Sequence, residues 1–132
     1  MTHKVLSALF PLDTSRYFPP MKIGGSKESA DRGASLILKG IKTTTSSMDW
    51  EYPDGKLPFE GALSVLLDGS DVPCAVVETS RVEIQKFSQV DKKFAYEYGE
   101  GDRTLNWWNT EIKEWYRQET TKRGLIFTKD IC

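Results

Sequence analysis

The segment GIKTTTSS, residues 40–47, combines one lysine with a run of hydroxyl side chains. Lys42 is followed by five consecutive threonines and serines, Thr43 to Ser47. A lysine whose pKa is lowered by burial can activate a neighbouring hydroxyl as a nucleophile, and Thr45 is the candidate hydroxyl. A solvated strand of β-branched residues explains the same run without chemistry. On a strand, Lys42 and Thr45 point to opposite faces, so the catalytic interpretation requires a bend in the chain.

A second group of chemically useful side chains is the sequence EYGEGD, where three carboxylates surround two glycines. One of these carboxylates could act as a general acid or base, or two could hold a divalent cation. Asp102 is explained structurally as a helix cap and Glu97 as part of a solvated helix face. Glu100 has no comparable structural explanation, so we single it out as a site residue.

Aromatic residues near both segments could stack on a flat ring. Trp107 lies about 100° around a helix from Trp108, where an indole can stack on a base or simply cover the edge of the core. Trp50 and Tyr52 come after the hydroxyl run and could form the floor of a pocket. Cys74 lies in an apolar stretch, which predicts an inert core cysteine.

Composition limits the chemistry that is available. The chain of 132 residues has a net charge of −1, one histidine and two cysteines, and it predicts one globular domain without general attraction for nucleic acid. His3 lies near a terminus that we expect to be mobile, so we expect neither a zinc site nor His-based acid–base catalysis. Catalytic groups must then come from Lys, Asp, Glu, Ser, Thr and Tyr, and we expect no metal and no cofactor.

The spacing of apolar residues, together with caps, glycines and prolines, predicts the helices and strands that position these residues. We expect residues 1–22 to form an irregular lead-in, because three prolines interrupt its later half and Gly24 and Gly25 follow it. Gly40 ends a predicted helix that Ser26 caps. The further predictions are strands at 41–46, 62–68, 73–85 and 124–128, a turn at 68–71, and helices capped by Ser88 and by Asp102. This order predicts an α+β protein whose strands curl into a small barrel.

No segment has the length or apolar character of a membrane span or the pattern of a signal peptide. We therefore expect a cytoplasmic protein.

The helix–GIKTTTSS step and the later run FAYEYGEGDRTL together resemble the ASCH domain family. The resemblance extends over about residues 23–128 and identifies residues 23–132 as a single ASCH domain. It implies a PUA-like fold, a small mixed-strand β-barrel with packed helices. It also implies RNA, a nucleotide or a modified nucleoside as the partner, and leaves the oligomeric state open.

The resemblance also implies roles for individual residues. Some bacterial ASCH proteins hydrolyse the amide of N4-acetylcytidine with a lysine, a threonine and a glutamate, which correspond to Lys42, Thr45 and Glu100, with Glu97 as the alternative carboxylate. Another bacterial member is a metal-dependent ribonuclease whose lysine also corresponds to Lys42. The family signature often has an arginine where this chain has Ser47, which leaves the substrate open.

Three hypotheses result. The first is an amidohydrolase of N4-acylated, cytidine-like substrates. The second is a non-catalytic RNA- or nucleotide-binding module in which Lys42 meets a phosphate. The third, a metal-dependent ribonuclease, requires convergence of Glu97, Glu100 and Asp102. The expected substrate-binding residues are Thr44, Ser47, Trp50, Glu97 and Trp107.

Overall fold

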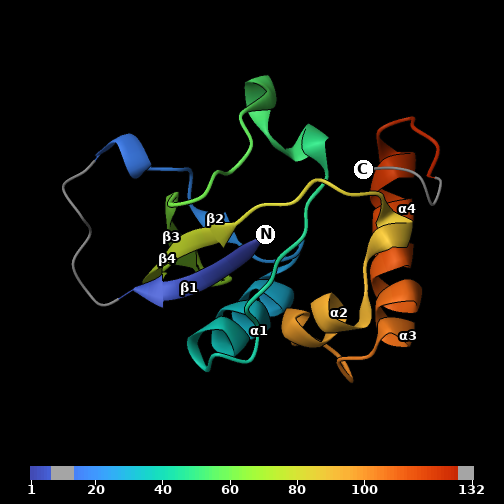
Figure 1. The fold of residues 1–132 in the computed structure, drawn as a ribbon, viewed down its shortest axis with the longest axis horizontal. Helices are drawn as coiled ribbons and strands as arrows, with labels where there is room; N and C mark the ends of the chain where they lie inside the picture. The colour runs from blue at the N-terminus through green and yellow to red at the C-terminus, as the bar shows by residue number, and fades with distance from the viewer. Residues whose placement is uncertain (7–13, 128–132) are drawn as a thin grey trace. The chain divides into compact units, whose positions relative to one another are not determined.

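The structure, a computed structural model, describes residues 1–6 and 14–127 (Figure 1). The chain divides into two compact units, Met1–Glu83 and Ile84–Cys132. The first unit carries a β-sheet and a helix, whereas the regular elements described in the second unit are helical.

The first unit is built on a mixed four-stranded sheet in the order β1-β4-β3-β2. Neighbouring strands run antiparallel, except that β2 and β3 are parallel. The strands are β1 (Thr2–Leu6), β2 (Met21–Lys22), β3 (Leu63–Leu67) and β4 (Pro73–Arg81). Pro73 begins β4, where a strand needs no amide donor from its first residue. The sheet supplies Leu66 and Val77 to the buried core.

Helix α1 (Lys27–Leu38) supplies Ala34 and Ile37 to the same core. The Ser26 side chain accepts a hydrogen bond from the Ser29 amide, as predicted for the cap, and thereby satisfies an otherwise unpaired N–H of the first turn. Gly33 allows close packing inside the helix, because a Cβ there would lie 2.5 Å from Ile23 Cβ.

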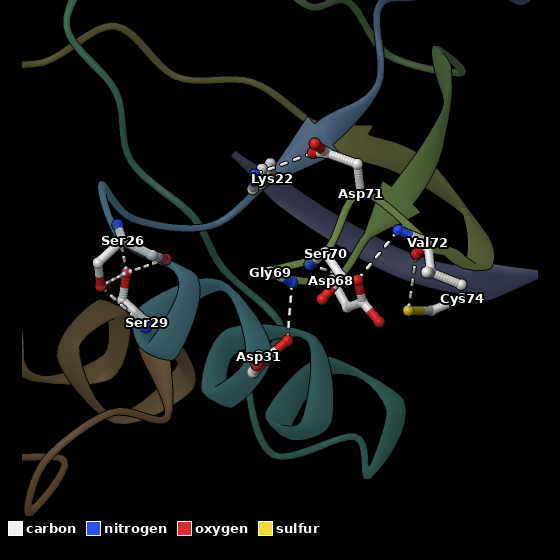
Figure 2. Close-up of polar contacts among 10 residues, drawn as sticks. All are labelled: Lys22, Ser26, Ser29, Asp31, Asp68, Gly69, Ser70, Asp71, Val72 and Cys74. Carbon is white, nitrogen blue, oxygen red and sulfur yellow. Dashed lines mark hydrogen bonds and ion pairs between the residues drawn. The ribbon is translucent and has the colours of Figure 1, made fainter.

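The turn between β3 and β4 fastens α1 to the sheet (Figure 2). The Gly69 amide donates to Asp31 Oδ1 at 2.7 Å, and a Cβ on Gly69 would lie 2.2 Å from the Lys27 carbonyl oxygen. Lys22 Nζ pairs with Asp71 Oδ1 at 2.9 Å on the same turn. The turn therefore ties the beginning of α1 to the sheet.

The second unit is helical. It contains α2 (Lys92–Tyr98), then α3 (Leu105–Trp107), a π-helical turn η5 (Trp108–Ile112) and α4 (Lys113–Lys122), and the last three adjoin one another without a break. Its core is aromatic: Trp108 is buried and contacts the rings of Phe87, Phe94 and Tyr98. The described residues also contain short 3-10 turns at η1 (Thr14–Arg16), η2 (Asp49–Glu51), η3 (Pro53–Gly55) and η4 (Phe87–Gln89).

Several predicted boundaries are wrong for local reasons. Helix α2 is capped by Asp91 rather than Ser88, because the Asp91 carboxylate accepts from the Phe94 amide while Ser88 lies in η4. Thr104 caps α3, and Asp102 instead accepts hydrogen bonds from Thr104. Residues 124–127 form no strand, and residue 128 lies outside the described residues.

The N-terminal lead-in and Cys74 also differ from expectation. Residues 1–22 contain the strands β1 and β2 rather than irregular chain alone. Cys74 is exposed at the start of β4, so it is not a core cysteine. The apolar residues that come after it gave no indication that the first residues of the strand face solvent.

Candidate functional site

The end of α1 sets the position of Lys42. Gly40 has a φ of 74°, and its amide donates to Ile37 O at 3.0 Å while the Ile41 amide donates to Leu36 O at 3.0 Å. These two bonds form the Schellman motif that ends many helices, and glycine adopts its left-handed conformation at the least cost. The Lys42 amide also donates to Leu36 O, at 3.1 Å. Lys42 is thus fastened directly to the last turn of the helix.

The hydroxyl run then pairs with strand β1. Thr44 forms an antiparallel β-bridge with Thr2, the His3 amide donates to Thr43 O at 3.1 Å, and the Thr45 amide donates to Met1 O at 2.9 Å. Residues 41–46 are not the regular strand that we predicted. They are an extended segment that lies along the edge of β1 through one bridge.

Burial alternates along this segment. Lys42 and Thr44 are each 1% exposed, whereas Thr43 and Thr45 are half-buried. The alternation fits an extended chain whose successive side chains point to opposite faces. Lys42 is not a solvated surface lysine, so the structural interpretation that competed with a site role for it does not apply.

Thr45 contacts His3, a residue for which the sequence predicts no role in the site. Its Oγ1 lies 2.9 Å from Nε2 of His3, and His3 is only 3% exposed. Burial, followed by the nearby positive charges of Lys42 and the N-terminal amine, lowers the pKa of His3 to about 4. The imidazole is therefore neutral at physiological pH. Our expectation that His3 lies on a mobile terminus is wrong, because β1 pairs with β4 on one edge and with the hydroxyl run on the other.

The residues after the hydroxyl run form a polar cluster in η2 and its flanks. The Ser47 hydroxyl hydrogen-bonds the Tyr52 hydroxyl, and the Met48 amide donates to Glu51 Oε2 at 2.5 Å. Burial raises the pKa of the Tyr52 phenol, although its bond to Ser47 acts in the opposite direction. Trp50 is half-buried in the same turn.

Glu100 lies in the second unit, on a tight loop after α2. It stands between Gly99 and Gly101, whose φ angles are 73° and 61°, and its carbonyl accepts from the Arg103 amide at 3.1 Å. Glu97, the alternative carboxylate, belongs to α2 and lies 3.9 Å from Lys93 in an i,i+4 ion pair.

Trp107 packs on this loop. A Cβ on Gly101 would lie 2.2 Å from the Trp107 ring atoms Cε2 and Nε1, so the indole rests directly against the glycine backbone. Trp107 also contacts the Tyr98 ring, with 6.5 Å between the ring centroids. This contact gives Trp107 a structural role in the unit that carries Glu100.

The sequence model of the ASCH domain matches residues 20–132. The chain belongs to the ASCH domain family. The expected family is thus confirmed, and the mixed sheet with its helices confirms the expected α+β class. ASCH domains are PUA-like and generally bind RNA.

Solved structures agree with this assignment. The chain is similar to the ASCH domain from Lactobacillus crispatus, with 26% identity and a TM-score of 0.79 over 87% of this chain and 73% of the other. It is also similar to a protein from Enterococcus faecalis, with 31% identity and a TM-score of 0.75 over 96% of this chain and 73% of the other. No functionally curated protein matches the sequence.

For this ASCH domain protein, the structure places His3, a residue without a predicted role, close to two predicted site residues of the first unit. His3 Nε2 lies 2.9 Å from Thr45 Oγ1, and the charge of Lys42 contributes to the lowered pKa of His3. Glu97, Glu100 and Trp107 belong to the second unit. Across residues 1–6 and 14–127, no three His, Cys, Asp or Glu side chains gather as a possible metal site. None of the helices in this described part of the chain is long and apolar enough to cross a bilayer.

Proposed function

We propose that this ASCH domain protein hydrolyses the amide of an N4-acylated cytidine or a closely similar modified nucleoside. The observation that carries the proposal is the burial of Lys42 on the segment that also presents Thr45. A catalytic amine must spend part of its time uncharged, which a solvated lysine does not do at neutral pH. A lysine withdrawn from water and fixed by a helix end is in the environment that this chemistry requires.

In the proposed reaction, Thr45 Oγ1 attacks the acyl carbon and Lys42 takes the hydroxyl proton. Glu100 then gives a proton to the departing N4 amine as the C–N bond breaks. The resulting threonine ester is cleaved by water, which passes a proton to the Glu100 carboxylate. The Lys42 ammonium returns its proton to the Thr45 oxygen, so that both groups and the free hydroxyl are restored. We assign Glu100 rather than Glu97 to the acid role, because Glu97 already pairs with Lys93 on the face of α2.

The test is hydrolysis of N4-acetylcytidine, followed by the ultraviolet change on deacetylation. We expect Lys42→Met to lower kcat by about 10²- to 10⁴-fold, the usual contribution of a general base. Lys39→Met is the matched control, since Lys39 is an exposed lysine three residues earlier and should retain full activity. Absence of turnover by the wild-type protein would reject this substrate.

A second candidate, a non-catalytic RNA- or nucleotide-binding module, is favoured by the concentration of positive charge near His3. Lys42 and the N-terminal amine both act on this imidazole. Two cations in one place would attract a phosphate. Thr44 and Ser47 could then bond the sugar or base, with Trp50 or Trp107 stacking. The ribonuclease ranks last, because Glu97 pairs with Lys93 and Asp102 with Thr104.

A further inference from the structure

We propose that His3 is a positioning residue of this site: its neutral imidazole holds the Thr45 hydroxyl in the orientation required for attack. The inference rests on the proposed function, because it assigns a role in that same reaction. It adds His3, a residue of strand β1, to the proposed catalytic residues Lys42, Thr45 and Glu100.

The geometry of the pair supports this role. His3 Nε2 and Thr45 Oγ1 are 2.9 Å apart, within ordinary hydrogen-bond distance. A threonine hydroxyl can rotate among staggered positions, and this bond selects one of them. The register of β1 against β4 shifts at this point, with Thr2 opposite Arg81 but His3 opposite Thr79, and such irregularities re-aim side chains.

The surroundings of the other ring nitrogen, Nδ1, indicate that His3 positions the hydroxyl and does not act as its base. His3 Nδ1 is buried and has no hydrogen-bond partner among the described residues. In a catalytic triad, a carboxylate at this nitrogen stabilises the imidazolium that forms when the His acts as a general base. Here Lys42 and the N-terminal amine are the charged groups that act on the imidazole, and both oppose a further positive charge. His3 can hold the hydroxyl but is poorly suited to keep its proton.

The first arm of the test needs no activity. Because the chain has one histidine, the ring ¹⁵N spectrum of uniformly labelled protein reports on His3 alone. We expect a single neutral tautomer at pH 6 and a shifted Nε2 resonance in Thr45→Val, which removes the hydroxyl at nearly constant shape. Thr120→Val, a buried threonine of the second unit, is the control and should leave the ring spectrum unchanged. A ring that titrates near its ordinary pKa of about 6.5 and ignores Thr45→Val would overturn the inference.

The second arm uses N4-acetylcytidine. His3→Phe keeps the ring volume without nitrogens, and we expect kcat to fall about 10- to 100-fold with KM within about twofold, as a misoriented nucleophile predicts. His3→Gln retains a side-chain amide that can hold the hydroxyl, and it should recover most of kcat with an unchanged pH profile. Equal losses of kcat in His3→Gln and His3→Phe would overturn the positioning role. If the wild type does not turn over, the proposed function fails, while the spectral arm still decides whether His3 holds Thr45.

Discussion

At the scale of single residues, His3 is the side chain whose behaviour departs furthest from its ordinary chemistry. It is 3% exposed, and its ring shares a small region with Lys42 and the N-terminal amine. The folded protein therefore keeps the imidazole neutral at pH values where an unfolded chain would protonate it. This difference between the two states connects the site to stability.

The stability of the protein should fall as the pH is lowered from about 6.5 to about 4. Over this range the unfolded state binds a proton at His3 that the folded state does not, so the free energy of unfolding decreases with acidification. The full effect is about 3 kcal/mol, from about 1.36 kcal/mol per unit of pKa difference. Urea denaturation at several pH values measures it.

His3→Gln is the control for this prediction, because glutamine does not titrate. The variant should lose most of the dependence between pH 6.5 and 4. Carboxylates whose pKa values are lowered in the folded protein, such as Glu78 and Glu119, still make stability fall at lower pH. An identical pH dependence in the variant and the wild type would show that His3 is not the responsible group.

The sequence predicts only part of the arrangement around Thr45. The choice of Lys42 came from the GIKTTTSS motif, and the burial of its side chain agrees with the environment that a catalytic lysine needs. The sequence predicts no role for His3, because residues close to a terminus are usually mobile. Its contact with Thr45 joins residues 42 positions apart through strand pairing, and no local pattern contains that information.

At the scale of elements, the end of α1 couples helix termination to the site. Gly40 and Gly124 occupy equivalent positions, each with a left-handed φ and each in a Schellman motif at the end of a helix. A Cβ would meet nothing within 4 Å at either position. The two glycines differ in the residues that come next, since Gly40 leads to Lys42 and Gly124 leads to no candidate site residue.

This equivalence makes Gly40→Ala and Gly124→Ala a matched pair. Each should lower the free energy of unfolding by about 1–2 kcal/mol, because alanine adopts the left-handed conformation at that cost. Gly40→Ala alone should also reduce hydrolysis of N4-acetylcytidine, since relaxation of the strained turn moves Lys42. Equal stability losses with equal activities would mean that the helix end does not determine the position of Lys42.

The Glu100 loop provides a second prediction at this scale. Gly101 has a left-handed φ of 61°. In Gly101→Ala, the new Cβ would also lie 2.2 Å from atoms of the Trp107 ring. We expect it to destabilise the protein by at least about 1 kcal/mol more than Gly124→Ala, because the indole must move. Thermal unfolding followed by circular dichroism compares the two variants, and equal midpoints would contradict the packing of Trp107 on this loop.

Elements were predicted where local chemistry determines them. Ser26 and Gly40 bound α1 as expected, and Pro73 begins β4. Prediction failed where two residues offered the same function, since Ser88 and Asp91 can both cap a helix and the structure uses Asp91. The π-helical turn η5 was not predicted either. Leu105, Trp108, Ile112 and Trp115 recur at ordinary helical spacing, which does not distinguish a π-helical turn from an α-helix.

At the scale of the whole molecule, charge limits how nucleic acid can be bound. The net charge is −1, so long-range attraction to a polyanion is weak. Any RNA binding must then depend on a few local cations, of which Lys42 is the one that begins the hydroxyl run.

Binding of a short single-stranded RNA should therefore depend only weakly on salt. Contact with one or two phosphates gives a slope of about −0.7 to −1.4 in a plot of log K against log salt concentration. Lys42→Met should reduce the magnitude of that slope by about 0.7, and Lys39→Met should not change it. Fluorescence anisotropy titrations at several salt concentrations measure both. A much steeper slope would indicate a basic surface other than this site.

The pairing of Thr43 to Thr45 with β1 has a consequence for self-association. The free edge of a strand offers unpaired amides and carbonyls to other chains, and native proteins protect such edges. Here the hydroxyl run pairs through its own backbone bonds with the beginning of β1, at Met1 to His3. The same few hydrogen bonds thus present the candidate nucleophile and shield the sheet from a second copy. A change that loosens this segment should make the protein prone to aggregate as well as less active.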